Sequence, residues 1–258
     1  MNMDALSNRE PTLSVVVPSL NHRRFIAQCL EEPLRLVPKG VEIIVMDGGS
    51  TDGTVSYLQE TLGSRIHWVS EKDRGQSHAI NKGLTLAKGQ WVAFQNSDDF
   101  YVAEKLEDVL GILKESSADI VIGGMISVNE DGSVFRSSMP KPIFYPCLSQ
   151  LNFINNQSFF VRRALLDRVG FLDEKLRFCL DYDWFVRILK ARPRIHYVPD
   201  VIGAQRFYQG TKTSTMKDVH DQEFDLVARR HFSYPERLLG WLMLRPYRLF
   251  RYFYGVFR

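Results

Sequence analysis

The chain has 258 residues, of which 45% are hydrophobic, so it can bury the core of one large domain or of one domain with an appendage. Its 33 basic and 30 acidic side chains leave a net charge of +3, and this balance gives no reason to expect nucleic-acid binding. The cysteines, Cys29, Cys147 and Cys179, are odd in number and widely spaced, which argues against a disulfide framework and against a structural zinc site.

The amino-terminal residues give no targeting signal. Residues 1–10 are polar and lack the basic-then-apolar pattern of a signal peptide, and no uncharged apolar run reaches the length that spans a membrane. We therefore expect a cytoplasmic protein. We divide it into a polar lead of residues 1–11, a large domain of residues 12–232 and an extension of residues 233–258.

The first elements form a βαβ unit. Residues 13–18 and 41–46 are continuous apolar runs rich in β-branched residues, which predict parallel strands buried on both faces, with a helix over 25–37 between them. The alternation then continues with a helix at 52–62, a strand at 66–69, a helix at 76–87, a strand at 91–94, a helix at 104–116 and a strand at 119–122. This order predicts an α/β doubly wound fold, with a mostly parallel sheet flanked by helices.

The pattern changes after Gly123. Residues 125–128 and 133–136 predict a β-hairpin around the turn 129–132. Further along we expect an extended connection at 140–147, a strand at 157–161, a helix at 181–191 and a mobile loop over a site at 203–217.

Two adjacent carboxylates, Asp98 and Asp99, follow the strand predicted at 91–94. Ligands of open α/β sheets bind at the carboxyl ends of the strands, and carboxylate oxygens suit Mg²⁺ or Mn²⁺. The pair therefore predicts a metal that meets a phosphorylated substrate. The alternative is that the two residues only cap the helix that follows.

A second loop at this edge contains Asp47, Gly48 and Gly49. The glycines let the backbone approach a ligand closely, and the Asp47 carboxylate offers acceptors to a base or a ribose. The alternative is an ordinary turn with a helix N-cap at Ser50 or Asp52.

Five motifs occur in one order: VVVPSLN at 15–21, IIVMDGGSTDGT at 43–54, DRGQSHAINKG at 73–83, NSDD at 96–99 and DYDW at 181–184. Through these motifs the sequence closely resembles the family-2 glycosyltransferases of the GT-A fold, over roughly residues 12 to 215. The resemblance implies that a sugar passes from a nucleotide-diphosphate donor to a hydroxyl acceptor with inversion at the anomeric carbon. It makes residues 12–232 the catalytic domain.

The resemblance also assigns the donor site. Asp47 corresponds to the carboxylate that contacts the nucleotide base, in a pocket that Pro18, Ser19 and Asn21 line. Asn96 stands where the family has the first Asp of its Asp-x-Asp motif, so ribose contact by this residue is in doubt, and Asp98 is the implied metal ligand with Asp99 as a second ligand or an orienting partner. The remaining residues implied to bind the nucleotide sugar are Asp73, Gly75, Asn81, Ser97 and Arg206.

The catalytic base is implied at Asp181, which matches the Asp of the family's Glu-Asp motif although Leu180 replaces the Glu. Asp183 competes for the same role. We favour Asp181 because Asp183 can pair with Arg187 at i, i+4 on one helix. Residues 209–212 resemble a segment that folds over the diphosphate, and a plain flexible loop is the alternative.

The implied cofactor is Mg²⁺ or Mn²⁺, and the implied partners are a UDP-, GDP- or dTDP-sugar and a glycan or lipid-linked acceptor, in polysaccharide or glycoconjugate synthesis. One alternative function is a catalytically silent nucleotide-sugar-binding subunit. A nucleotidyltransferase is disfavoured, because PSLN at 18–21 is not a Gly-rich phosphate loop.

The carboxyl-terminal segment combines aromatic residues with arginines. Beyond Glu236 every charged residue is Arg, at positions 237, 245, 248, 251 and 258. Such a segment predicts an amphipathic element that contacts anionic lipid at the inner face of the cell membrane. The alternative is a helix packed on the catalytic domain or in a dimer interface.

Overall fold

A computed structural model describes residues 10–254, and for residues 247–254 only the backbone is described. The predicted lead of residues 1–11 therefore lies almost wholly outside the described residues, as do the side chains of Arg248, Arg251 and Arg258. The strands are β1 (Leu13–Ser19), β2 (Val41–Asp47), β3 (His67–Ser70), β4 (Trp91–Phe94), β5 (Phe100–Tyr101), β6 (Ile120–Asn129), β7 (Val134–Ser138), β8 (Phe159–Arg162) and β9 (Ile195–Phe207).

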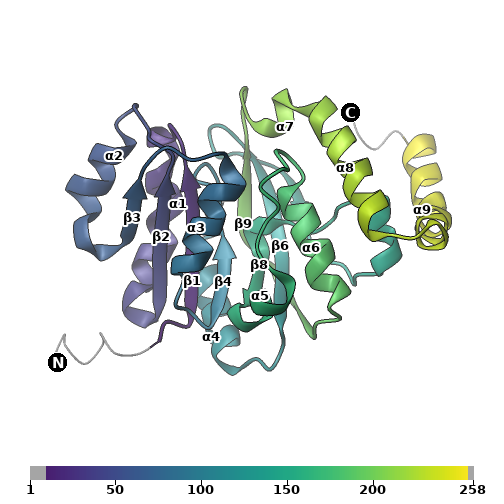
Figure 1. Cartoon of the computed structure of the whole chain (residues 1–258), viewed down its shortest axis with the longest axis horizontal. Helices are drawn as coiled ribbons and strands as arrows, with labels where there is room; N and C mark the ends of the chain where they lie inside the picture. Colours follow the sequence, from purple (N-terminus) through teal and green to yellow (C-terminus); the bar gives the residue numbers. More distant parts are fainter. Residues whose placement is uncertain (1–9, 255–258) are drawn as a thin grey trace.

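All these strands join one sheet in the order β3-β2-β1-β4-β8-β6-β9-β5, with β7 beside β6 (Figure 1). Strands β1 to β4 are parallel, as their continuous apolar sequences predict. β8 is antiparallel to both β4 and β6, whereas β9 is parallel to β6. The sheet thus begins as a doubly wound parallel sheet and becomes mixed in its second half.

Helices cover both faces of the sheet (Figure 1). They are α1 (Arg23–Leu36), α2 (Thr54–Tyr57), α3 (Gln76–Leu86), α4 (Lys105–Glu115), α5 (Arg163–Val169), α6 (Leu180–Lys190), α7 (Lys212–Thr215), α8 (Lys217–His231) and α9 (Tyr234–Tyr254). Short helical turns occupy Val37–Lys39, Leu58–Leu62, Gly63–Arg65, Tyr145–Ser149 and Asn156–Ser158. The helix predicted at 52–62 is therefore α2 continued by a π-helical turn.

Two hydrophobic cores lie on opposite faces of the sheet, and β1 contributes to both. Val16 faces the core formed with α3 and α6, whereas Val15 and Val17 face the core formed with α1 and α4. Successive side chains of a strand point to opposite faces, so a strand buried on both sides needs an apolar residue at most positions. This requirement explains the mostly apolar runs that identify the sheet in the sequence, and the buried Ser14 of β1 is an exception that donates a hydrogen bond to Glu42 of β2.

Strand β6 joins two segments that the sequence separates. The predicted strand at 119–122 and the first arm of the predicted hairpin at 125–128 form one strand, with register shifts at Gly123 and Gly124. A Cβ atom at Gly123 would lie 2.1 Å from Ile202 Cδ1, so the close approach of β9 requires glycine. The glycine pair therefore bends a strand instead of ending it.

The prediction of a loop at 203–217 is wrong for its first part. Residues 203–207 continue β9 and pair in register with residues 125–129, and α7 and the start of α8 follow. Gly203 is required here because a Cβ atom would lie 2.2 Å from the backbone oxygen of Gln157. A glycine that permits close packing thus resembles a loop glycine in the sequence.

Helix α9 packs on the domain through its first half. A Cβ atom at Gly240 would lie 2.1 Å from the backbone oxygen of Pro146, so the helix contacts the turn Tyr145–Ser149 directly at this glycine. The predicted packing alternative is therefore correct for this part of the extension. Within residues 10–254, none of the helices is long and apolar enough to cross a membrane.

Replacing Gly240 by Ala should detach or shift α9. The added methyl group overlaps backbone, which cannot move away as a side chain can, so we expect a loss of about 1–3 kcal/mol in the free energy of unfolding. Denaturant unfolding of the full chain measures it. Gly111→Ala is the matched control, because that helical glycine faces open space and its replacement should be neutral or stabilising. Equal stability of the two variants would contradict the packing described.

Candidate active site

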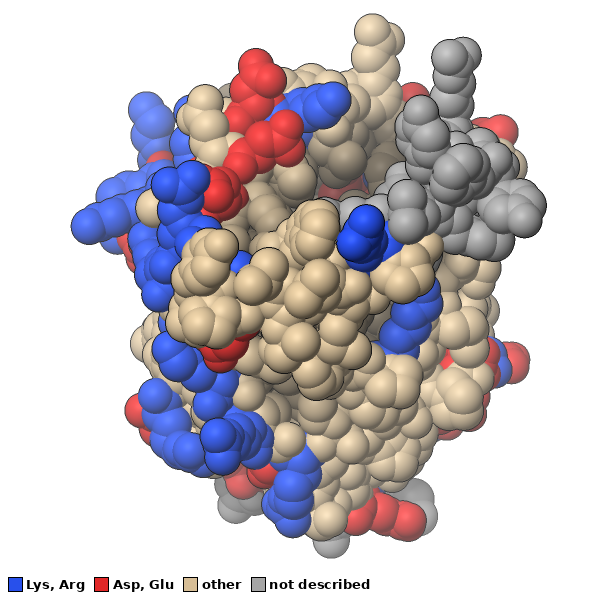
Figure 2. All heavy atoms as spheres, turned by 90° about the vertical axis from the view of Figure 1, so that its right-hand side faces the viewer, with Lys and Arg blue, Asp and Glu red and all other residues tan. Residues whose placement is uncertain are grey.

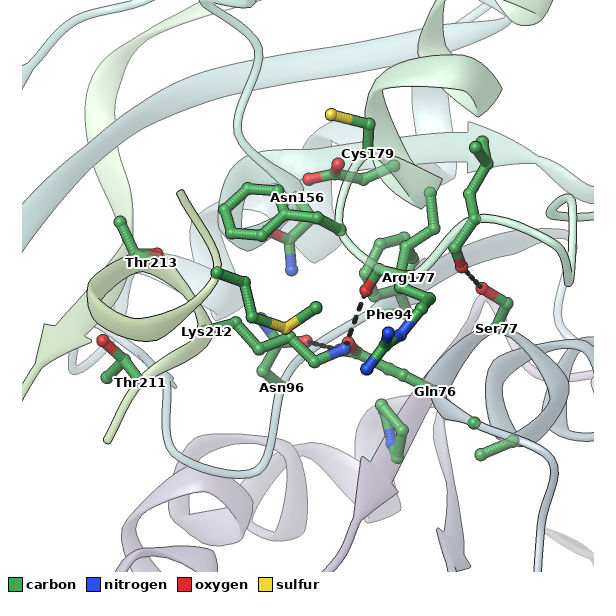
Figure 3. Close-up of a pocket in the computed structure, with 18 of the residues that line it drawn as sticks. Gln76, Ser77, Phe94, Asn96, Asn156, Arg177, Cys179, Thr211, Lys212 and Thr213 are labelled. Carbon is green, nitrogen blue, oxygen red and sulfur yellow. Dashed lines mark hydrogen bonds between the residues drawn. The ribbon is translucent and has the colours of Figure 1, made fainter. Parts of the chain in front are cut away.

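A pocket of about 880 Å³ opens at the carboxyl ends of β1 and β4, the edge that the sequence predicts. Segments from the whole chain contribute to its wall, including residues 18–20, 73–77, 96–99, 174–182 and 205–213. Figure 3 shows residues of these segments directed toward a common cavity. The fold thus brings most of the predicted motifs together.

Asp47 is buried and organises the turn that follows it. Its Oδ2 atom accepts hydrogen bonds from the backbone N–H groups of Gly49 and Ser50 at 3.0 and 2.9 Å, and from Ser70 Oγ at 2.7 Å. Asn21 ties its own loop to this turn, because its Oδ1 accepts the Thr51 N–H at 2.8 Å. Asp47 and Asn21 therefore shape the loops beside the pocket, whereas Pro18 and Ser19 line it.

The third motif divides into a part that lines the pocket and a part that does not. Asp73 and Gly75 line it, and the Asp73 carboxylate accepts the Gly75 N–H at 2.8 Å. Asn81, predicted to bind the donor, lies outside the pocket lining. Its amide exchanges hydrogen bonds with the backbone of Leu172 at 2.9 and 3.0 Å. The position of Asn81 therefore indicates that it holds the 172–174 segment.

Asp98 and Asp99 differ in their surroundings. Asp99 is 3% exposed, and its two oxygens accept hydrogen bonds from the Arg206 N–H, Gln157 Nε2 and Asn96 Nδ2 at 2.8, 2.7 and 3.0 Å. Burial, and next the neighbouring Asp98 charge, raise the pKa of Asp99 to about 7. The Asp98 carboxylate faces the pocket and accepts a hydrogen bond from the Tyr208 hydroxyl at 3.0 Å.

These contacts decide between two alternatives for the acidic pair. The next helix, α4, begins at Lys105 and has Glu104 as its N-cap residue, so neither aspartate caps it. Asp99 has the contacts of an orienting partner, because both of its oxygens are already bonded to the protein. Asp98 remains as the carboxylate of the pair that faces the pocket with only the Tyr208 hydroxyl as its described hydrogen-bond donor.

Arg206 also differs from its prediction as a donor ligand. Its guanidinium group donates to the backbone oxygens of Asp98 and Glu130 at 3.1 and 2.7 Å and to Gln28 Oε1 at 2.5 Å. Arg206 lines the pocket, but these bonds fasten the 98–99 loop to its neighbours. We therefore describe it as the anchor of that loop.

The two candidate bases have opposite environments. Asp181, in the first turn of α6, lines the pocket, and burial raises its pKa to about 6. Asp183 is 1% exposed and lies outside the pocket lining, with Arg187 Nε and His231 Nε2 each 2.8 Å from its carboxylate. Burial raises the pKa of Asp183, but hydrogen bonds from His231 and Arg187 outweigh it and lower the pKa. The expected pairing with Arg187 is present.

Lys212 crosses the pocket toward Gln76. Its ammonium group donates to Gln76 Oε1 and, at 3.2 Å, to the backbone oxygen of Arg177 (Figure 3). Desolvation of the ammonium group by the surrounding protein lowers the pKa of Lys212, and the negative charge of Asp181 opposes that shift. A positively charged side chain, Lys212, thus lies in the same pocket as Asp98 and Asp181.

Glu223 supports the segment before Asp181, and the sequence analysis missed it. From α8 its carboxylate accepts the backbone N–H groups of Arg177, Phe178 and Cys179 at 2.8, 2.8 and 2.9 Å. These are the residues directly before α6, whose N–H groups need acceptors from outside the helix. No short-range signal could identify Glu223, because it lies more than 40 residues further along the chain.

Glu223→Gln should lower kcat while leaving donor affinity nearly unchanged, since the residue holds the segment before Asp181 without touching the donor side. Loss of charged hydrogen bonds should also cost about 1.5–3 kcal/mol of stability. Steady-state kinetics and thermal unfolding measure both effects. Asp225→Asn on the same helix is the control, because Asp225 is exposed and its carboxylate pairs with Arg229 four residues further along α8. Equal kcat in the two variants would contradict the supporting role.

Comparison with known proteins identifies the family. The sequence profile of glycosyl transferase family 2 matches residues 14–170, more than half of the chain. The chain belongs to glycosyl transferase family 2. A PGL/p-HBAD biosynthesis glycosyltransferase of Mycobacterium tuberculosis is 30% identical over 226 residues, which cover 83% of this chain and 82% of that protein.

Other relatives are longer. Chondroitin synthase of Escherichia coli is 26% identical over 248 residues, covering 95% of this chain and 35% of the synthase. An uncharacterised glycosyltransferase of Rickettsia felis also shares only 35% of its length. The chain thus spans about a third of the length of each of these relatives.

Solved structures confirm the GT-A fold. TarS of S. aureus in complex with UDP-GlcNAc superposes with a TM-score of 0.66 at 21% identity, covering 84% of this chain and 66% of that one. The mannosyltransferase PcManGT of Pyrobaculum calidifontis, in complex with GDP-Man and Mn²⁺, gives 0.59 at 17% identity and covers 94% and 84%. The mixed sheet flanked by helices is the expected architecture of this family-2 glycosyltransferase domain.

The residues around Asp98 fit a divalent cation whose ligands come partly from the protein and partly from a substrate. Among residues 10–254 no group of three His, Cys, Asp or Glu residues could hold a metal by itself. Mg²⁺ is commonly held by one or two carboxylates with water and substrate phosphates. One carboxylate directed into the pocket, that of Asp98, meets this minimum.

Proposed function

We propose that this domain transfers a sugar from a nucleoside diphosphate to a hydroxyl group, with inversion at the anomeric carbon. The observation that carries the proposal is that Asp98, Lys212 and Asp181 line one pocket. Lys212, and a divalent cation that Asp98 would hold, suit a diphosphate, and Asp181 suits a hydroxyl that must lose its proton. The family membership supports the same reaction class.

Asp181 acts as the general base in this proposal. It takes the proton of the acceptor hydroxyl while the acceptor oxygen forms a bond to the anomeric carbon. The bond from that carbon to the phosphate oxygen breaks, and its electron pair leaves with the nucleoside diphosphate. Attack opposite the leaving group inverts the centre, and the protein forms no covalent intermediate.

The residues that bind the sugar donor stabilise the negative charge that develops on the departing nucleoside diphosphate. Asp98 would hold Mg²⁺ or Mn²⁺, which supplies Lewis-acid stabilisation of the departing diphosphate when bound. Lys212 supplies a fixed positive charge in the same pocket. Asp99 and Arg206 hold the 98–99 loop in place. Asp73 and Gly75 would line the diphosphate side of the pocket. The nucleoside side would be lined by Pro18, Ser19, Asn96 and Ser97.

UDP-, GDP- and dTDP-sugars are the proposed donors, in the synthesis of a polysaccharide or a glycoconjugate. TarS and PcManGT support the UDP- and GDP-sugars, because their structures contain UDP-GlcNAc and GDP-Man. The names of chondroitin synthase and of the PGL/p-HBAD biosynthesis glycosyltransferase support a role in biosynthesis, and the glycan or lipid-linked acceptor is part of our proposal. A silent nucleotide-sugar-binding subunit is the second candidate, and the placement of Asp181 in one pocket with Asp98 and Lys212 favours an enzyme over it.

A thermal-shift screen of nucleotide sugars with Mn²⁺, followed by an assay for released nucleotide, tests the proposal. A preferred donor should raise Tm by mass action and should be turned over. A donor that binds but releases no nucleotide with any acceptor, or with water, would favour the silent subunit. Failure of every donor to bind would reject the proposal.

We further propose that α9 makes peripheral contact with an anionic membrane at the cytoplasmic face. Its exposed side chains include Leu238, Trp241, Leu242 and Met243, and Arg245 follows them. Figure 2 shows the end of the molecule where α8 and α9 lie, with a broad area of uncharged residues bordered on one side by Lys and Arg. Apolar insertion and attraction of arginines to lipid headgroups reinforce each other on such a surface.

Leu242→Asp should reduce sedimentation of the full chain with phosphatidylglycerol vesicles at low salt. Leu242 is 48% exposed, so its replacement removes a membrane contact without opening the core. Leu86→Asp is the matched control, because Leu86 is equally exposed at 48% on α3. Added salt should weaken binding of the unaltered chain. Failure of the unaltered chain to sediment with the vesicles would reject membrane contact.

A further inference from the structure

Aromatic side chains line the pocket on the α8 side of Asp181. Phe178, His220 and Phe224 line the pocket here, and their rings contact one another. The ring centroids of Phe178 and His220 are 5.0 Å apart, and those of His220 and Phe224 are 5.9 Å apart. Tyr182 stacks on Phe224 at 4.6 Å and fixes that ring. This aromatic wall is half-buried, so one side of it remains available to a ligand.

Asn156 provides an unused hydrogen-bond donor in the same pocket. The residue is 6% exposed, and its Nδ2 atom has no hydrogen-bond partner. Figure 3 shows this nitrogen directed into the cavity. A buried amide almost always has a partner, so an unpaired one in a pocket indicates a ligand or an ordered water.

The position of Asn156 is fixed by its neighbours. Gln157 donates to Asp99 at 2.7 Å, and the Ser158 hydroxyl donates to the backbone oxygen of Gly123 at 2.9 Å. The turn Asn156–Ser158 is therefore held on both the acidic loop and β6. The unpaired amide thus belongs to a rigid element, which is the property expected of a preorganised binding group.

We propose that this subsite binds the ring of a carbohydrate acceptor, so that the hydroxyl attacked at Asp181 belongs to a sugar and not to a lipid or a protein. The inference rests on the proposed function. A pyranose ring presents an apolar C–H face, which suits the Phe178–His220–Phe224 wall, and hydroxyl oxygens at its edge, which suit the Asn156 amide. A linear alkyl chain leaves the Asn156 donor unpaired, and a peptide hydroxyl has no flat apolar face.

Saturation-transfer NMR on the full chain tests the subsite without the donor. The probes are methyl glycosides of glucose, galactose, mannose, rhamnose and N-acetylglucosamine, with citronellyl phosphate and N-acetylserine amide as the lipid and peptide alternatives. At least one glycoside should receive saturation at its ring protons. Asn156→Ala and Phe178→Leu should reduce this signal at least fivefold, and Asn155→Ala, outside the pocket lining, should leave it unchanged.

The variants also distinguish a binding role from a structural one. Asn156→Ala removes a donor that makes no bond, so its Tm should equal or exceed that of the unaltered chain. A lower Tm, glycoside signals unaffected by Asn156→Ala, or a preference for citronellyl phosphate or the serine amide would overturn the inference. Donor binding measured in parallel separates the proposals. Bound donor without bound glycoside rejects this subsite and leaves the proposed transferase function standing. Bound glycoside without any bound donor rejects the transferase function and leaves a carbohydrate-binding site that has no acceptor role.

Discussion

Asp181→Asn should lower kcat by about 10²–10⁴-fold, the range expected when a positioned general base is removed. Donor affinity should stay nearly constant, because Asp181 acts on the acceptor hydroxyl and Asp98 and Lys212 serve the diphosphate. Steady-state kinetics and donor titration of the same variant measure the two quantities. A collapse of donor affinity with high residual turnover would make Asp181 a donor-binding or structural residue.

The pH profile gives a second readout of the same residue. Asp181 must be ionised to take a proton, and burial raises its pKa to about 6. We therefore expect kcat/KM of the unaltered enzyme to rise about tenfold per pH unit below 6 and to level off above it. Asp181→Asn should lose this acidic limb. An unchanged limb in the variant would assign it to another group.

Asp183→Asn is the matched control for Asp181→Asn, because the two carboxylates lie two residues apart on α6. Asp183 is paired with Arg187 and His231, so breaking this buried pair should cost up to about 3–5 kcal/mol of stability. Asp181→Asn should not lower Tm at pH 8, since it removes a charge that burial disfavours. Loss of turnover without loss of Tm in the Asp183 variant would reverse the two assignments.

The parallel half of the fold could be predicted because local sequence determines it. A strand buried on both faces requires mostly apolar residues, and β1, β2 and β4 show this directly. The second half depends on contacts between distant residues. Gly123 and Gly203 resemble breakers in the sequence, yet both exist to allow close packing inside the sheet. Their role is visible only when the partner strand is in place.

The same distinction applies to the site. Asp98 and Asp181 lie in motifs with a local signature, and both line the pocket as predicted. Arg206 also lines the pocket, but its guanidinium bonds to Glu130 and Gln28, which no sequence pattern connects to it. Glu223 could not be predicted, because its partners are backbone N–H groups, which every residue except proline has. Sequence motifs thus identify the residues that face the pocket more readily than the residues that hold the pocket's loops in position.

Asp98→Asn should abolish the metal-dependent part of donor binding and lower kcat by about 10²–10⁴-fold. A neutral amide is a poor ligand for a hard cation, and Lewis-acid stabilisation of a leaving group contributes several kcal/mol, at 1.36 kcal/mol per tenfold in rate. Asn can still accept the Tyr208 hydroxyl, so the fold should be retained. Donor titrations with and without Mn²⁺ measure the metal-dependent increment.

Two controls separate the metal from the carboxylate in this experiment. Tyr208→Phe removes the hydroxyl that contacts Asp98 Oδ2 and His22 Nε2 but keeps the Asp98 carboxylate, so it should keep most of the metal-dependent increment that Asp98→Asn loses. Excess EDTA should reduce the unaltered enzyme to the activity of Asp98→Asn and should change that variant little. Full activity of Asp98→Asn, or of the unaltered enzyme in EDTA, would show that Asp98 holds no essential metal, and Lys212 would then be the principal charge on the diphosphate.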